Sequence, residues 1–171
     1  MTANIVDVNV AIVANDLRRQ LNGQSLNAPQ ADEKCRVACV AILTRIIRKE
    51  IIVIDTEGDT IREYLKRLST SGQPSIGDAL LKFILEQQYT HKRIQRITIK
   101  RNAKRKYDLF PDDPDLKTFD QADRIYVALN RSVPDSRLLN AVDSDYSQHA
   151  AALARNGVDV RELCPGCIKT D

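Results

Sequence analysis

The sequence contains no tryptophan, two histidines, six glycines and six prolines among its 171 residues. So little glycine and proline excludes collagen-like and low-complexity chains, and 43% hydrophobic residues excludes an intrinsically disordered one. No uncharged apolar run approaches the roughly 18 residues that a membrane helix needs. The start of the chain lacks the basic and apolar regions of a signal peptide. We therefore expect one folded domain over residues 1–171, located in the cytoplasm and without a membrane segment.

Several common catalytic motifs are also missing. The sequence has no glycine-rich dinucleotide motif, no P-loop, no H-E-x-x-H and no G-x-S-x-G. With only His91 and His149 available, a histidine-activated serine or cysteine nucleophile is disfavoured. We expect His149 to be a surface residue on the polar face of a helix.

The four cysteines are predicted to be reduced thiols or metal ligands, because no export signal precedes them. Cys164 and Cys167 have the spacing of zinc ligands, and Cys35 and Cys39 lie one helical turn apart. If the two pairs met, they would form a structural Zn²⁺ site. The favoured interpretation makes Cys35 and Cys39 small core residues of an apolar helix face.

Apolar spacing predicts strands that alternate with helices. We expect strands over 4–8, 51–54, 94–99, 138–142 and 158–163, a loop over 15–30, and helices over 11–13, 31–49, 60–68, 76–88, 120–129 and 146–156. This alternation is typical of an α/β fold in which helices sandwich a mostly parallel sheet.

Acidic residues follow the predicted strands, at the edge where open parallel sheets bind ligands. Asp7 ends the first strand, Asp143 and Asp145 follow a later one, Asp123 lies in the first turn of the preceding helix, and Glu63 lies on the helix after the second strand. Gathered carboxylates repel each other, and a hard divalent cation with oxygen ligands relieves that repulsion.

Each acid also has a purely structural interpretation. Asp123 and Asp143 are suited to capping helices, and Glu63 to a solvated helix face. Asp7 is the hardest to explain structurally, because it interrupts an apolar strand where an unpaired carboxylate is costly.

Four segments together form a recognisable pattern. They are Ile5-Val6-Asp7-Val8-Asn9-Val10, the helix 123–128, the segment Asn140-Ala141-Val142-Asp143-Ser144-Asp145-Tyr146, and the closing strand 157–160. In this order they resemble the motifs of the PIN-domain nucleases. The resemblance spans nearly the whole chain, in the family's order. It implies a three-layer α/β/α sandwich, with the basic region around 91–118 as an insertion.

The resemblance also implies an endonuclease that depends on Mg²⁺ or Mn²⁺ and cuts RNA in preference to DNA. It implies catalytic metal ligands at Asp7, Glu63, Asp123 and Asp143 or Asp145, supported by Asn9. Glu57 competes with Glu63 for the second position. The family includes toxins, defence effectors and RNA-processing enzymes, so the resemblance leaves the biological role open among these. It also implies an inhibitor or antitoxin protein as partner, and a homodimer. The alternative is a non-catalytic module that binds nucleic acid or protein within a larger complex.

One stretch concentrates positive charge. The segment from Lys92 to Lys106 has eight basic residues and no acid, which leaves a net charge of −5 on the rest of the chain. Such a segment favours an anionic polymer as partner, although charges that protect a sheet edge would look similar. The predicted nucleic-acid-binding residues are Lys92, Arg93, Arg96, Lys100, Arg101, Lys104, Arg105 and Lys106.

Overall fold

The computed structural model describes residues 1–90 and 92–168, so His91 lies outside the described residues. The strands are β1 (Ala3–Val6), β2 (Ile51–Asp55), β3 (Ile94–Ile97), β4 (Arg101–Asn102), β5 (Lys106–Tyr107), β6 (Arg137–Asn140) and β7 (Val160–Glu162). The helices are α1 (Val8–Leu21), α2 (Glu33–Lys49), α3 (Asp59–Arg67), α4 (Ile76–Gln87), α5 (Arg124–Ser132), α6 (Ser144–Gln148) and α7 (Ala150–Arg155), with 3₁₀ turns η1 (Pro114–Leu116) and η2 (Pro165–Cys167).

Five strands form one parallel sheet in the order β3-β2-β1-β6-β7. The chain first moves outward from β1 to β3, then crosses back to β6 and moves outward the other way. Right-handed crossovers therefore place the helices before and after this reversal on opposite faces. The α/β/α sandwich with a parallel sheet is confirmed.

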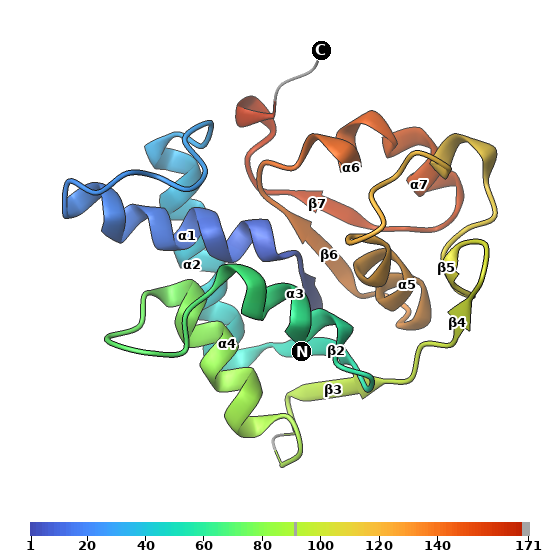
Figure 1. Cartoon of the computed structure of the whole chain (residues 1–171), viewed down its shortest axis with the longest axis horizontal. Coiled ribbons are helices and arrows are strands. Elements are labelled where there is room, and N and C mark those ends of the chain that lie inside the picture. Colours follow the sequence, from blue (N-terminus) through green and yellow to red (C-terminus); the bar gives the residue numbers. More distant parts are fainter. Residues whose placement is uncertain (91, 169–171) are drawn as a thin grey trace.

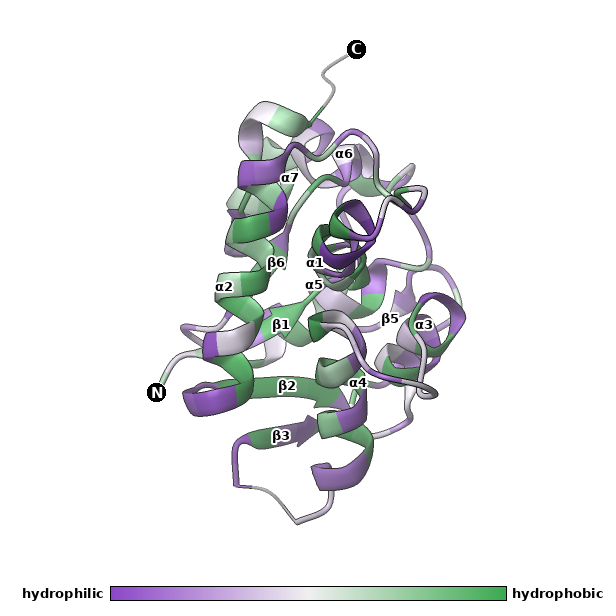
Figure 2. Cartoon of the chain, turned by 90° about the vertical axis from the view of Figure 1, so that its left-hand side faces the viewer, coloured by the Kyte–Doolittle hydropathy of each residue, from purple (hydrophilic) through white to green (hydrophobic). Residues whose placement is uncertain are grey.

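The helices fall into two groups that agree with this topology. Helices α1, α2 and α4 contact one another, whereas α5 packs on β1, β2 and β6, and α7 packs on β7. Figure 1 shows the first group on one side of the molecule and α5, α6 and α7 on the other. The strands between them carry the hydrophobic core, which is visible for β1 and β2 in Figure 2.

The main differences from the predicted elements lie outside the sheet. The loop expected from residue 15 begins only after Leu21, because α1 continues through a polar stretch in which the buried Asp16 anchors the next segment. Its carboxylate accepts the Asn27 and Ala28 N–H groups at 3.0 and 2.7 Å. The helix expected over 146–156 is divided into α6 and α7 at His149.

The antiparallel hairpin β4–β5 was not predicted. Each of its strands has only two residues, too few to show alternation, and it lies against α5. None of the helices within the described residues is both long and apolar enough to cross a membrane.

The expectation that the four cysteines are reduced thiols or metal ligands, and not disulfide-bonded, is wrong for one pair. Cys35 and Cys164 form a disulfide with Cα atoms 5.3 Å apart. The disulfide joins residues 129 positions apart, so no local sequence pattern predicts it. Cys35 and Cys39 are both buried on the core face of α2, as expected.

Candidate metal centre

The sheet reverses its strand order at β1 and β6, which are direct neighbours. Asp7 is the first residue after β1, and Asp143 follows β6 by three positions. Because parallel strands end at the same edge, the two carboxylates meet in the crevice where α/β sheets commonly bind ligands. The predicted location of the site is therefore the one that the topology produces.

Asp123 completes a group that we call the acidic cluster: Asp7, Asp123 and Asp143. One carboxylate oxygen from each lies within 4.8 Å of the others. Asp123 is the residue before α5, but its side chain makes no capping hydrogen bond to that helix. The capping interpretation therefore fails for Asp123, and its carboxylate faces the other two acids instead.

Asp7 is fully oriented by its neighbours. Its Oδ1 accepts the Asn9 N–H at 2.9 Å, and its Oδ2 accepts the Tyr146 hydroxyl at 2.6 Å. The Tyr64 hydroxyl donates to the Val6 carbonyl at 2.5 Å and so fixes the residue before Asp7. The three tyrosines around this point, Tyr64, Tyr126 and Tyr146, are completely or almost completely buried.

Asn9, which is predicted to support the site, joins the start of α1 to the end of β6. Its Nδ2 donates to Asn140 Oδ1 at 2.9 Å, and its Oδ1 accepts the Ala141 N–H at 2.8 Å. Asn140 in turn donates to the Asp143 carbonyl at 2.8 Å and to Glu162 at 2.7 Å. This network ties the start of α1 to the ends of β6 and β7, and so sets the distance between Asp7 and Asp143.

Burial and mutual repulsion raise the pKa values of two members of the acidic cluster. Burial raises the pKa of Asp7 to about 7, with a contribution from the Asp143 charge, although the Asn9 and Tyr146 hydrogen bonds oppose the shift. Burial, followed by the charges of Asp7 and Asp143, raises the pKa of Asp123 to about 10. The metal-free cluster therefore holds protons at neutral pH.

These features fit a hard divalent cation. Three carboxylates within reach of one ion supply oxygen ligands, which Mg²⁺ and Mn²⁺ prefer. A cation would replace the protons and remove the repulsion that raises the pKa values. The acidic cluster opens into a cleft of about 480 Å³ whose wall also includes Asn9.

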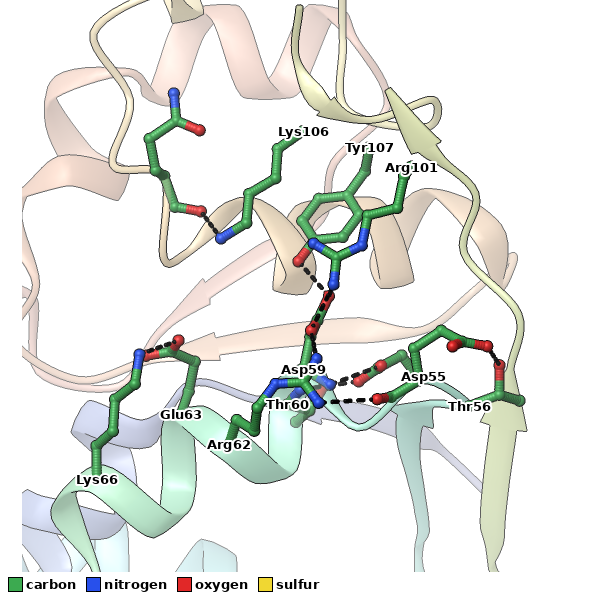
Figure 3. Close-up of polar contacts among 12 residues, drawn as sticks. Asp55, Thr56, Asp59, Thr60, Arg62, Glu63, Lys66, Arg101, Lys106 and Tyr107 are labelled. Atoms are coloured by element: carbon green, nitrogen blue, oxygen red, sulfur yellow. Dashed lines mark hydrogen bonds and ion pairs between the residues drawn. The ribbon is translucent and has the colours of Figure 1, made fainter. Parts of the chain in front are cut away.

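The residue predicted as the second acidic ligand, Glu63, does not join the acidic cluster. Glu63 lines the same cleft, but its carboxylate pairs with Lys66 at 2.7 Å. Within the described part of the chain, the group of close carboxylate oxygens contains Asp7, Asp123 and Asp143 but not Glu63. Figure 3 shows this pair along one face of α3. Glu57 is exposed beside Thr56 and does not line the cleft, so Glu63 remains the better placed of the two.

Asp145 is engaged elsewhere. Its Oδ2 accepts the Asp120 N–H at 2.7 Å, and its Oδ1 lies 3.2 Å from His149 Nδ1. The expectation of a surface position for His149 is wrong: its side chain is 11% exposed and its ring lies 5.4 Å from that of Phe119. Asp145 therefore braces the loop before α5, whereas Asp143 faces the acidic cluster.

The predicted basic segment divides into residues with different roles. Arg93 donates to the carbonyls of Ile46 and Ile47 at the end of α2, and Arg96 donates to the Thr56 carbonyl, with its guanidinium 4.5 Å from the Tyr89 ring centroid. Both contacts are structural. Lys92, Lys100 and Lys104 are exposed, and Arg105 pairs with Asp112 at 3.6 Å.

Arg101 and Lys106, from the hairpin, lie next to the cleft. With Arg62 and Lys66 they line a cavity of about 250 Å³, which we call the basic pocket and which shares Glu63, Lys66 and Ala122 with the cleft. In Figure 3, Arg62, Arg101 and Tyr107 converge on Asp59; Tyr107 donates to it at 2.6 Å and Arg101 at 2.8 Å.

Several residues at the site were not selected from the sequence. Lys66 and Arg67 line the cleft, three and four positions after Glu63, so their helical spacing from it was an available signal. The tyrosines had no such signal, because their spacing is also that of ordinary core residues.

Comparisons of this chain with protein-family models, with curated protein sequences and with solved structures found no match. The assignment of a function therefore depends on the residues and geometry of the cleft.

Proposed function

We propose that the protein is a PIN-like, metal-dependent endonuclease that hydrolyses RNA. The observation that carries this proposal is the convergence of Asp7, Asp123 and Asp143 at the carboxyl ends of two adjacent parallel strands. Keeping these three carboxyl groups ionised together is costly to a metal-free protein, and a divalent cation removes that cost.

The chain would hold the cation through the acidic cluster. A bound Mg²⁺ or Mn²⁺ ion would activate water and stabilise phosphoryl charge in the transition state. Tyr146 and Asn9 fix the orientation of the Asp7 carboxylate, so that little rearrangement is needed when the substrate arrives.

The neighbouring basic pocket supports a nucleic-acid substrate. Lys66, at the border of the cleft, and Lys106, on the hairpin, line the basic pocket and would contact the phosphates that flank the scissile bond. Such contacts give affinity that depends on salt and not on base sequence. The direction of the RNA would then run from the cleft toward the β4–β5 hairpin.

A non-catalytic nucleic-acid-binding module is the second candidate. The observation that favours it is the Glu63–Lys66 ion pair, which keeps the fourth predicted acid out of the acidic cluster. Under the nuclease proposal, Glu63 would leave Lys66 and help to hold the cation when metal and RNA are bound.

The experiment is incubation of a labelled single-stranded RNA with purified protein and Mn²⁺. We expect cleavage by the wild type, none after chelation, and a loss of at least roughly 100-fold in Asp7→Asn. Glu57→Gln, which removes an exposed carboxylate outside the cleft, should cleave normally. RNA binding without cleavage in the presence of Mn²⁺ would instead establish the binding module.

A further inference from the structure

The four cysteines lie close together in the fold, and they come from other sequence segments than the acidic cluster. Cys35 and Cys39 lie one turn apart on the buried face of α2. Cys164 immediately precedes the 3₁₀ turn η2, and Cys167 is the last residue of that turn. The sulfur atoms of Cys35, Cys39 and Cys164 all lie within 4.8 Å of one another. The fold therefore brings together the two cysteine pairs that the sequence separates.

Cys167 lies beside this group of three. Its sulfur accepts the Asp32 N–H at 3.5 Å, and Asp32 is the N-cap of α2, immediately before the turn that carries Cys35. The Cys167 thiol is also near enough to contribute to the raised pKa of Cys39, whose main cause is burial.

The disulfide uses only half of this group. Cys35 and Cys164 are bonded, while Cys39 is fully buried and Cys167 half-buried as free thiols. Zn²⁺ accepts four thiolates in a tetrahedron with Zn–S bonds of about 2.3 Å, which places the sulfurs about 3.8 Å apart. The spacing among the sulfurs of Cys35, Cys39 and Cys164 is compatible with that tetrahedron once the disulfide is open.

We propose that Cys35, Cys39, Cys164 and Cys167 form a tetrathiolate Zn²⁺ site when the protein is reduced. A dithiol reductant gives two electrons and two protons to the Cys35–Cys164 disulfide and itself becomes a disulfide. Zn²⁺ then displaces the four thiol protons to water as four Zn–S bonds form. The ion would hold the end of the chain on the amino end of α2.

The Zn²⁺ site would also stabilise β7, which takes part in the hydrogen-bond network around the acidic cluster through Glu162. The chain reaches Cys164 directly from β7, whose Glu162 accepts the Asn140 amide. Fastening the segment after β7 to α2 limits the movement of β7 relative to the sheet. Its role is structural, because four protein ligands leave no open position for a substrate.

The test is metal analysis of full-length protein purified under a thiol reductant without chelator, followed by replacement of the metal with Co²⁺. We expect about one Zn²⁺ per chain and the visible absorption of a tetrahedral cobalt–thiolate centre. Cys39→Ser and Cys167→Ser should each abolish that spectrum, although neither residue belongs to the disulfide. Asp7→Asn, which alters the acidic cluster alone, should keep it.

Two results would overturn the proposal. The first is reduced, folded wild type that takes up neither Zn²⁺ nor Co²⁺. The second is a tetrahedral cobalt–thiolate spectrum that survives in Cys167→Ser, the half-buried position where serine is least disruptive to folding. Iron in place of zinc in the metal analysis would contradict the identity of the ion.

Discussion

Replacing Asp7 by asparagine should stabilise the metal-free protein at neutral and alkaline pH. Burial raises the pKa of Asp7 from 3.8 to about 7. Between these values the folded protein binds a proton that the unfolded chain releases, so stability falls as pH rises from about 4 to about 7. Above pH 7 the folded protein must carry the buried charge, and the free energy of unfolding falls no further.

The size of this loss of stability follows from the raised pKa of Asp7. A change of roughly three pKa units corresponds to about 4 kcal/mol, since each unit is worth about 1.4 kcal/mol. Asparagine keeps the size of the side chain and an oxygen to accept the Asn9 N–H, but its amide is a weaker partner for Tyr146. We therefore expect Asp7→Asn to raise the free energy of unfolding by about 2–4 kcal/mol at pH 8.

The assay is urea unfolding in EDTA at a series of pH values from 4 to 8.5. The difference between Asp7→Asn and wild type should be small near pH 4, grow through pH 4–7 and level off above it. Glu57→Gln, at an exposed position, should show little difference throughout. A variant that is no more stable than wild type at pH 8, or a difference that does not change with pH, would refute the reasoning.

Two further perturbations probe the surroundings of Asp7 and the basic pocket. Tyr146→Phe removes the hydroxyl that donates to Asp7 and should lower the free energy of unfolding by about 1–3 kcal/mol in urea titrations. Tyr126→Phe should be neutral or stabilising, because that buried hydroxyl has no hydrogen-bond partner among the described residues; equal losses in both would contradict the role of Tyr146. Lys106→Gln should reduce the slope of log K against log salt for single-stranded RNA by about 0.7, whereas Lys92→Gln, at the amino end of β3, should leave it unchanged. Equal slopes for the two variants would mean that RNA does not pass the basic pocket.

The sheet and the principal acids could be predicted because both follow from strand ends. Apolar runs locate β1 and β6, and in a parallel sheet their carboxyl ends must share an edge. The strand order could not be predicted, and it is the direct pairing of β1 with β6 that brings Asp7 close to Asp143. The orientation of a side chain is a different question. Glu63 has the predicted position on α3, but Lys66, three residues later, holds its carboxylate.

Features without local periodicity could not be predicted. The β4–β5 hairpin has two residues per strand, and the Cys35–Cys164 pairing depends on where the end of the chain returns to α2. The eight clustered basic residues were equally ambiguous. Sequence proximity suggested one binding surface. In the fold, Arg93, just before the edge strand β3, contacts the end of α2, whereas the hairpin brings Lys106 to the basic pocket.

The most direct test of the central claim is calorimetric titration of the metal-free protein with Mn²⁺. We expect the wild type to bind Mn²⁺ and Glu57→Gln to bind it equally well, because Glu57 does not line the cleft. Asp7→Asn and Asp123→Asn, both folded, should lose the binding. A wild type that binds no Mn²⁺, or variants that bind it as tightly as the wild type, would contradict the assignment of Asp7, Asp123 and Asp143 as a metal centre.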